Sequence, residues 1–343
     1  MRGKHLWAPA LALFLFVSGC SDDPEPEPQA APSPSPTVEP ECSLSGMDIP
    51  SGVDAARPAV AIKVENTTSA YPLSGLEHAE IVYEELVEGG FTRFMALYHC
   101  SDANKVGPVR SARSVDPGIL GPITKIMGAA GSNNFVRKYL KRGKIVTIEE
   151  DTKGRALRRI SRPGVAAEHT LYGNTEKVRA VGSKRYDKPP PIDLFEFGGL
   201  GDAGKPARVV TVRFGSTVVQ YKWSKDGYVR FDFGDPLRTE KGKRITVDNV
   251  LIEQHRLGYS KVLFDVLGNP SVEIKNVTGS GPAALFRDGR VILGRWERDS
   301  ANDPVRFVTK GGDPMVLKVG STWIELAPSK KGQVKGGFEY SRK

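Results

Sequence analysis

Cysteine and histidine are scarce in this chain of 343 residues, which contains three cysteines and five histidines. Cys100 has His99 as a neighbour, but the remaining cysteines do not complete a tetrahedral zinc site of familiar spacing. A phosphate-binding loop, a dinucleotide fingerprint, an HExxH motif and an EF-hand pattern are also missing. We therefore expect neither a metal site nor a cofactor.

Long apolar runs are missing as well, except for one at the amino terminus. Arg2 and Lys4 precede an apolar run over residues 6–17, and the small residues Ser18 and Gly19 follow it before Cys20. This order is typical of a signal peptide over residues 1–20. The run is shorter than the roughly 20 residues that a permanent membrane span needs.

The sequence VSGC at residues 17–20 resembles the bacterial lipobox, in which the cysteine is acylated. We therefore predict that Cys20 is a lipid anchor carrying fatty acyl chains such as palmitate. A secretory signal with an incidental cysteine is the alternative. An anchored Cys20 would hold the protein at the extracytoplasmic face of a bacterial cell membrane.

Aromatic residues are absent from residues 21–41, SDDPEPEPQAAPSPSPTVEPE, which contain a single valine. A segment of this composition cannot bury a hydrophobic core. Its prolines favour extended conformations. We predict a stalk over residues 21–54 that holds a folded body away from the membrane.

Basic residues outnumber acidic ones, and the net charge is +9. Because the leader holds two cations and residues 21–41 hold six acids, residues 42–343 carry +13. Outside the cell membrane such a body is not expected to bind nucleic acid. Anionic lipid head groups or wall polymers are the expected counter-charges, and a basic surface without a specific partner is the alternative.

Cys42 and Cys100 remain as an even pair in an exported protein. This number and setting predict a disulfide between them, which would tie the end of the stalk to the first domain.

Hydrophobic patterning divides the folded body at a connection rich in proline and glycine, residues 191–206. Before it, strands are expected over 58–66, 79–100 and 144–150, and helical spacing over 117–127 and 133–143. After it, strands follow one another closely, and Asp226-Gly227 and Asp288-Gly289 predict hairpin turns. We predict an α+β chain: an α/β domain with a mixed sheet (55–190), a mostly antiparallel β domain (207–328) and a basic C-terminal tail (329–343).

Several segments of the body resemble the YerB-like bacterial lipoproteins, a family of two successive domains of unknown function. The similar segments are AIKVEN (61–66), AEIVYEELVEGGFTRF (79–94), VGPVRSARSVD (106–116), EHTLYG (168–173), FRDGRVILGRWER (286–298) and VGSTWIEL (319–326). The resemblance implies lipid anchoring and two domains, and it implies no established reaction. This chain has Glu168-His169-Thr170 where the family pattern suggests Pro-His-Asn, so no role is carried over to His169.

The segment GPVRSARSVD (107–116) holds Arg110, Arg113 and Asp116 at intervals of three residues. Two close guanidinium groups can hold a carboxylate or a phosphate by paired hydrogen bonds. The alternative is that they pair with Glu84, Glu85 or Asp116 and fix the loop to the sheet. Arg93 on a neighbouring strand completes the predicted anion-binding set.

Two weaker sets of residues are candidates for chemistry. Glu84 could act as a general acid or base, as in sugar hydrolysis, and His169 could act as a base. No recognised nucleophile motif surrounds Ser132. Ser132 precedes a predicted helix, and the backbone amides at the start of that helix could hold an anion. A tight glycine turn is the alternative for that loop.

These patterns predict a lipid-anchored envelope protein without a recognised catalytic motif. We expect it to bind or scaffold an anionic wall component, such as a wall polymer, or an envelope partner such as a peptidoglycan-synthesis protein. The alternative is a peptidoglycan-acting hydrolase that uses Glu84 or His169.

Overall fold

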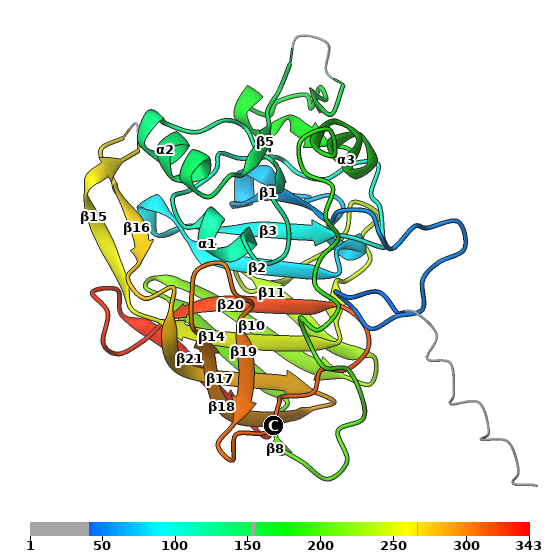
Figure 1. The fold of residues 1–343 in the computed structure, drawn as a ribbon. Coiled ribbons are helices and arrows are strands. Elements are labelled where there is room, and N and C mark those ends of the chain that lie inside the picture. Colours follow the sequence, from blue (N-terminus) through cyan, green and yellow to red (C-terminus); the bar gives the residue numbers. More distant parts are fainter. Residues whose placement is uncertain (1–40, 152–154, 266) are drawn as a thin grey trace, which may run out of the picture. The chain divides into compact units, whose positions relative to one another are not determined.

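The computed structural model describes residues 41–151, 155–265 and 267–343. The predicted signal peptide, Cys20 and residues 21–40 of the predicted stalk lie outside the described residues. Figure 1 shows the fold, coloured along the chain.

An eleven-stranded mixed sheet organises the described part of the chain. Its first-half strands are β1 (Val60–Asn66), β2 (Ile81–Leu86), β3 (Thr92–Tyr98), β4 (Ile126–Gly128) and β5 (Val146–Ile148). Its second-half strands are β8 (Lys205–Pro206), β14 (Asn249–His255), β17 (Gly279–Arg287), β18 (Arg290–Arg298), β19 (Arg306–Thr309) and β20 (Thr322–Pro328). The strand order is β19-β18-β17-β14-β20-β2-β3-β1-β4-β5, with β8 paired to β18.

The two halves of the chain meet inside this sheet. Strand β2 pairs in parallel with β20, so that Val82 lies opposite Trp323 and Glu84 lies opposite Glu325. In Figure 1 the cyan β2 and the red β20 run side by side. The two predicted domains therefore share backbone hydrogen bonds, although a division of the chain near residues 191–206 stays a prediction.

A six-stranded antiparallel sheet packs on one face of the large sheet. It consists of β9 (Val209–Phe214), β10 (Thr217–Ser224), β11 (Gly227–Asp232), β12 (Asp235–Pro236), β13 (Thr246–Val247) and β21 (Gly336–Ser341). Val64 and Phe94 of the large sheet share one buried apolar cluster with Val212 and Tyr221 of the smaller sheet. A second cluster, which includes Met95 and Leu120, covers the opposite face.

The α-helices of the described residues all precede the connection at residues 191–206. They are α1 (Asp116–Leu120), α2 (Asn134–Arg142) and α3 (Thr175–Gly182). Asn133 caps α2 by accepting a hydrogen bond from the Val136 amide at 2.9 Å, and Gly143 ends the helix, as the sequence predicts. Two small hairpins complete the described part: β6 (Leu157–Arg159) with β7 (Leu171–Gly173), and β15 (Leu257–Phe264) with β16 (Pro270–Ile274).

Local turn signals in the sequence agree with the structure. Asp288 and Gly289 both adopt positive φ, 51° and 68°, as a tight two-residue hairpin turn between β17 and β18 requires. The strands expected on either side of Gly89-Gly90 are β2 and β3. The predicted mixed first-half sheet and the mostly antiparallel second half are confirmed.

Some expected segments have other structures. Helical spacing over 117–127 gives only the short α1, because the chain turns at Gly121-Pro122 and Ile126–Gly128 pairs with β1 as β4. Within the predicted stalk, Leu44 is buried. The predicted C-terminal tail contains β21, which pairs with β9 because Phe338 and Tyr340 pack around Phe286.

The predicted disulfide is present. Cys42 and Cys100 are bonded, and their Cα atoms lie 6.0 Å apart. Within the described ranges no helix is long and apolar enough to cross a membrane.

Candidate functional site

The predicted site residues lie where the parallel strands of the first half end. Strands β1, β4 and β5 run in parallel, so their carboxyl ends share one edge of the sheet. The segment 107–116 crosses this edge: the Arg110 amide donates to Lys63 of β1, and the Arg110 carbonyl accepts from Ala130 after β4. Ligands of α/β sheets commonly bind at such an edge.

One face of β1, β2 and β3 changes from apolar to charged toward this edge. On β1, Ala61 is followed on the same face by Lys63 and Glu65 because side chains alternate along a strand. Strand pairing places Arg93 between Glu65 and Glu85. Arg93 therefore belongs to the sheet itself, whereas Arg110 and Arg113 belong to the crossing segment.

Arg93 and Arg113 meet at one backbone oxygen. The Nη1 atoms of both guanidinium groups donate to the Ser111 carbonyl, at 3.0 Å from Arg93 and 3.2 Å from Arg113. Burial, together with the charges of Arg113 and Arg110, lowers the pKa of Arg93 to about 9. Three guanidinium groups thus lie close enough together for their charges to repel.

Arg113 also has a strong carboxylate partner. Its Nη2 lies 2.5 Å from Glu88 Oε2, and the other Glu88 oxygen accepts from Ser271 of β16 at 2.6 Å. Burial by itself raises the pKa of the Glu88 carboxyl. The charge of Arg113 outweighs burial and holds this pKa below its usual value. Arg113 therefore has a structural partner, but that partner is Glu88 rather than the Glu84, Glu85 or Asp116 side chains named as the alternative from the sequence.

Arg110 shares a carboxylate with His169. Glu65 Oε2 lies 2.8 Å from His169 Nδ1 and 3.7 Å from Arg110 Nε. Arg110 Nη1 also donates to the Glu168 carbonyl at 3.2 Å. The Arg110 side chain is 25% exposed, so part of its guanidinium remains accessible to a ligand.

Asp116 is fully buried and holds the crossing segment in place. One of its oxygens lies 2.8 Å from Lys63 Nζ, and the other accepts from the Arg113 amide at 2.6 Å. Lys63 also pairs with Glu85, whose pKa burial raises to about 7. With both oxygens occupied, Asp116 orients Arg113 rather than facing a ligand.

Ser132 lies in the loop before α2, next to this site. Its hydroxyl oxygen is buried and has no hydrogen-bond partner among the described residues. The adjacent Gly131 carbonyl accepts from the Ala112 amide, so the loop and the crossing segment run side by side.

Glu84 is separated from this set by the sheet. It is fully buried on the opposite face, where its carboxylate lies 2.8 Å from the guanidinium of the buried Arg230. The structure thus brings together Arg93, Arg110, Arg113, Asp116 and Ser132 at one edge with His169, and it leaves Glu84 out.

Two sets of residues were missed by reasoning from the sequence. Lys63 and Glu65 could have been found, since charged residues on one face of an otherwise apolar strand are unusual. Glu253 and His255, on one face of β14, are 3% and 4% exposed and lie 3.0 Å apart. The consecutive residues Glu-Gln-His in a predicted strand place Glu253 and His255 on the same face, and this alternation could have identified the pair.

No group of three or more His, Cys, Asp or Glu side chains in the part of the chain that is described is arranged to hold a metal ion.

Comparison with known proteins identifies relatives over most of the chain. The family model described as "Protein of unknown function (DUF3048) N-terminal domain" matches residues 44–188, and the corresponding C-terminal model matches residues 210–324. A protein named as a lipoprotein, YerB of Bacillus subtilis (strain 168), is 28% identical over 300 residues, 83% of this chain and 85% of the relative. The crystal structure of Bacillus subtilis YerB has the same fold, with a TM-score of 0.69, 23% identity, and coverage of 87% of this chain and 99% of that one.

Proposed function

The chain belongs to the YerB-like family that the two DUF3048 models describe, and from this premise we propose a lipid-anchored protein of the bacterial envelope that binds an anionic group at Arg93, Arg110 and Arg113. The ligand would be a carboxylate or phosphate of a wall polymer or of an envelope partner protein. The protein would act by binding rather than by catalysis.

The convergence of Arg93 and Arg113 on the Ser111 carbonyl carries this proposal. Among the described residues Arg93 has no carboxylate within ion-pair distance, although two other guanidinium groups lie nearby. An anion placed between Arg93 and Arg110 would reduce this repulsion and would accept paired hydrogen bonds from planar guanidinium groups. The buried Ser132 hydroxyl, which has no partner in the described structure, belongs to the loop that runs beside the crossing segment.

The envelope setting rests on the amino terminus and on the relative named as a lipoprotein. A diacylglyceryl group on Cys20 would supply two acyl chains, and two chains hold a protein at a membrane stably where one does not. A tethered body would search the wall close to the membrane, where anionic polymers are its natural counter-charges.

Binding is tested with the double variant Arg93→Gln, Arg110→Gln, which leaves the Arg113–Glu88 pair intact. We expect it to fold normally and to lose roughly 100-fold in affinity for purified anionic wall polymer, since a hydrogen bond to a charged group contributes about 1.5–3 kcal/mol. The matched control is Arg137→Gln, an exposed arginine on α2 whose Nη2 lies 3.5 Å from Glu149. Unchanged affinity of the double variant would refute the proposed site.

A hydrolase is the second candidate, and the His169–Glu65 pair favours it. A carboxylate hydrogen-bonded to one ring nitrogen orients a histidine as a general base. Glu84, by contrast, is buried against Arg230 and is a poor candidate for the acid. Release of soluble fragments from purified wall, lost in His169→Gln but not in Arg137→Gln, would establish this reading. No release across pH 5–8 would eliminate it.

A further inference from the structure

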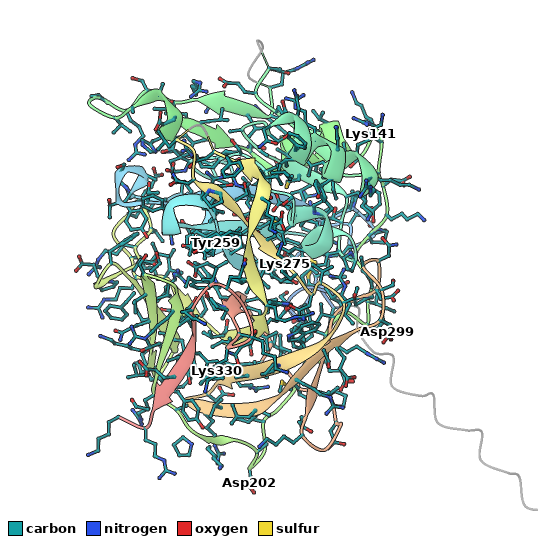
Figure 2. The ribbon with its side chains drawn as sticks, turned by 90° about the vertical axis from the view of Figure 1, so that its left-hand side faces the viewer. Lys141, Asp202, Tyr259, Lys275, Asp299 and Lys330 are labelled. Atoms are coloured by element: carbon teal, nitrogen blue, oxygen red, sulfur yellow. A yellow bond between two sulfur atoms is a disulfide. The ribbon has the colours of Figure 1, made fainter. Side chains whose placement is uncertain are left out.

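A groove of about 570 Å³ opens where the two halves of the chain meet. The first half contributes α1, Lys125 and the end of α2, and the second half contributes β16 and the loop after β18. In Figure 2 these walls are found by the labels Lys141 on α2, Lys275 after β16 and Asp299 after β18. Its volume lies within the range of small-molecule sites, which often form between such units.

A second, inner cavity of about 30 Å³ lies against the same walls. The two cavities share Val115, Gly118, Ile274 and Val277. Deeper in, the inner cavity is lined by polar and aromatic side chains: Tyr83, Glu253, His255, Trp296 and Arg298. About 10–15 Å³ is enough for a single water, so the inner cavity has room for one small polar group.

Glu253 gives the inner cavity an unused acceptor. Its Oε2 lies 3.0 Å from His255 Nε2, and the imidazole ring stacks on Trp296 with 4.6 Å between the ring centres. Its Oε1 is buried without a hydrogen-bond partner among the described residues. A buried carboxylate oxygen is expected to have a donor, so this position requires a hydroxyl, an amide or a water.

Arg298 fixes the walls of the cavity. Its guanidinium donates to the carbonyls of Gly118 and Ala301, both at 2.6 Å, and its Nε donates to the Asp303 carbonyl at 2.9 Å. It thereby links α1 of the first half to the loop after β18. These hydrogen bonds fix the position of α1 relative to the loop after β18.

Uncompensated positive charge lines the outer groove. Lys125 and Arg142 have no carboxylate within ion-pair distance in the described ranges, whereas Glu273, the one acid among the described groove residues, pairs with Lys275. Burial, followed by the charges of Lys144 and Arg298, lowers the pKa of Lys125. An anionic group in the groove would reverse this effect.

Tyr139 adds an aromatic surface to the same groove. The side chain lines the groove and is 42% exposed, with the Arg142 guanidinium 5.9 Å from its ring centre. Aromatic side chains present a large apolar face that a sugar ring can cover.

We propose that the groove and the inner cavity form a binding site for an acidic sugar. A hydroxyl or amide of the sugar donates to Glu253 Oε1, the ring covers Tyr139, and the acidic substituent lies between Lys125 and Arg142. The site shares no residue with the Arg93–Arg110–Arg113 set. A negative result at one site therefore does not bear on the other.

Binding of three probes to the full-length protein tests the assignment by calorimetry or ligand-observed NMR. The probes are N-acetylmuramic acid, N-acetylglucosamine, which lacks the acidic substituent, and lactate, which lacks the sugar. We expect N-acetylmuramic acid to bind at least tenfold more tightly than either of the others. Lys125→Met should remove this preference without weakening N-acetylglucosamine, and Glu253→Gln should weaken both sugars about equally.

Lys141→Gln is the matched control, because Lys141 neighbours Arg142 on α2 but does not line the groove. It should bind all three probes as the native chain does. Arg142→Gln should also remove the preference for N-acetylmuramic acid. Because Arg142 is exposed, this variant is expected to fold as the native chain does. The proposal is overturned if the native chain does not bind N-acetylmuramic acid at millimolar concentration. It is also overturned if Lys125→Met and Arg142→Gln both bind N-acetylmuramic acid as tightly as the native chain does.

Discussion

Replacing Arg230 by methionine should destabilise both halves of the protein together. Arg230 is fully buried on β11 and donates to both oxygens of Asp232, each at 2.8 Å. Its guanidinium also lies 2.8 Å from Glu84 of β2 and 3.2 Å from Glu325 of β20. The Arg230 guanidinium therefore pairs with three buried carboxyl groups, which come from three different strands.

The size of the effect follows from the groups left behind. Removing one partner of a buried ion pair costs about 3–5 kcal/mol, because an uncompensated charge remains in the core. At about 2.1 cal/mol/K per residue, a folded unit of roughly 300 residues has an unfolding entropy near 0.6 kcal/mol/K. The melting temperature should therefore fall by about 5–8 °C in a single transition.

The loss should also depend on pH. Burial raises the pKa values of Asp232 and Glu325, against the charge of Arg230 that lowers them. A carboxyl whose pKa is raised in the folded state stabilises at low pH and loses that contribution as pH rises. Without Arg230 both carboxyls bind protons more tightly still, so the variant should lose more stability at pH 8 than at pH 5.

Thermal unfolding followed by circular dichroism at both pH values checks this. Arg213→Met is the control: its side chain is 49% exposed and pairs with Glu339 at the surface, an interaction of about 0–1 kcal/mol. If Arg230→Met melts within about 2 °C of the native protein, or loses the same amount at both pH values, the charge argument is refuted.

Three further results are expected. Cys20→Ser should abolish lipid attachment, and mass spectrometry of the native amino terminus checks this; an unmodified Cys20 in the native protein would contradict it. Cys42→Ser with Cys100→Ser should cost about 4 kcal/mol in urea unfolding by the loop-entropy model, since the bridge closes a loop across a separation of 58 residues, and an unchanged midpoint would contradict this. Burial raises the pKa of Glu80 to about 7, so the protonated carboxyl stabilises the folded state. This contribution is complete below about pH 4.5 and is lost as pH rises through 7. It amounts to about 3 kcal/mol, at 1.36 kcal/mol per pKa unit. Glu80→Gln should flatten the pH dependence of the urea midpoint between pH 5 and 8, and an unaltered slope would argue against this role.

Much of the local structure could be predicted because its causes are local. Alternating apolar residues on either side of Gly89-Gly90 predict β2 and β3, and Asp288-Gly289 predicts a tight turn because these residues tolerate positive φ. The cysteine count, taken with the predicted leader, predicts the Cys42–Cys100 bridge that the structure contains. The helical spacing at 117–127 failed because burial of Ile126 and Met127 beside β1 outweighs a local helical pattern.

The candidate site could be predicted only in part. The spacing of Arg110 and Arg113 points to an anion site, but their partners depend on where distant strands lie. Glu88 meets Arg113, and Glu65 meets both Arg110 and His169, because strand pairing and the crossing segment place them there. Ion pairs have no signature in the sequence, since any nearby carboxylate satisfies an arginine equally well.

By itself the sequence determined the disulfide pair, the alternation of strands and turns, and the position of the arginines in segment 107–116, and it predicts a leader. Only the tertiary structure decided that β2 and β20 lie side by side and that Arg230 joins Glu84 to Glu325 in the core. It also decided that Glu253 and His255 line a cavity that shares walls with the groove lined by Lys125. Parallel pairing of strands far apart in the chain depends on how whole faces pack. The local period of two gives each side chain a face but not the neighbour that the face will meet.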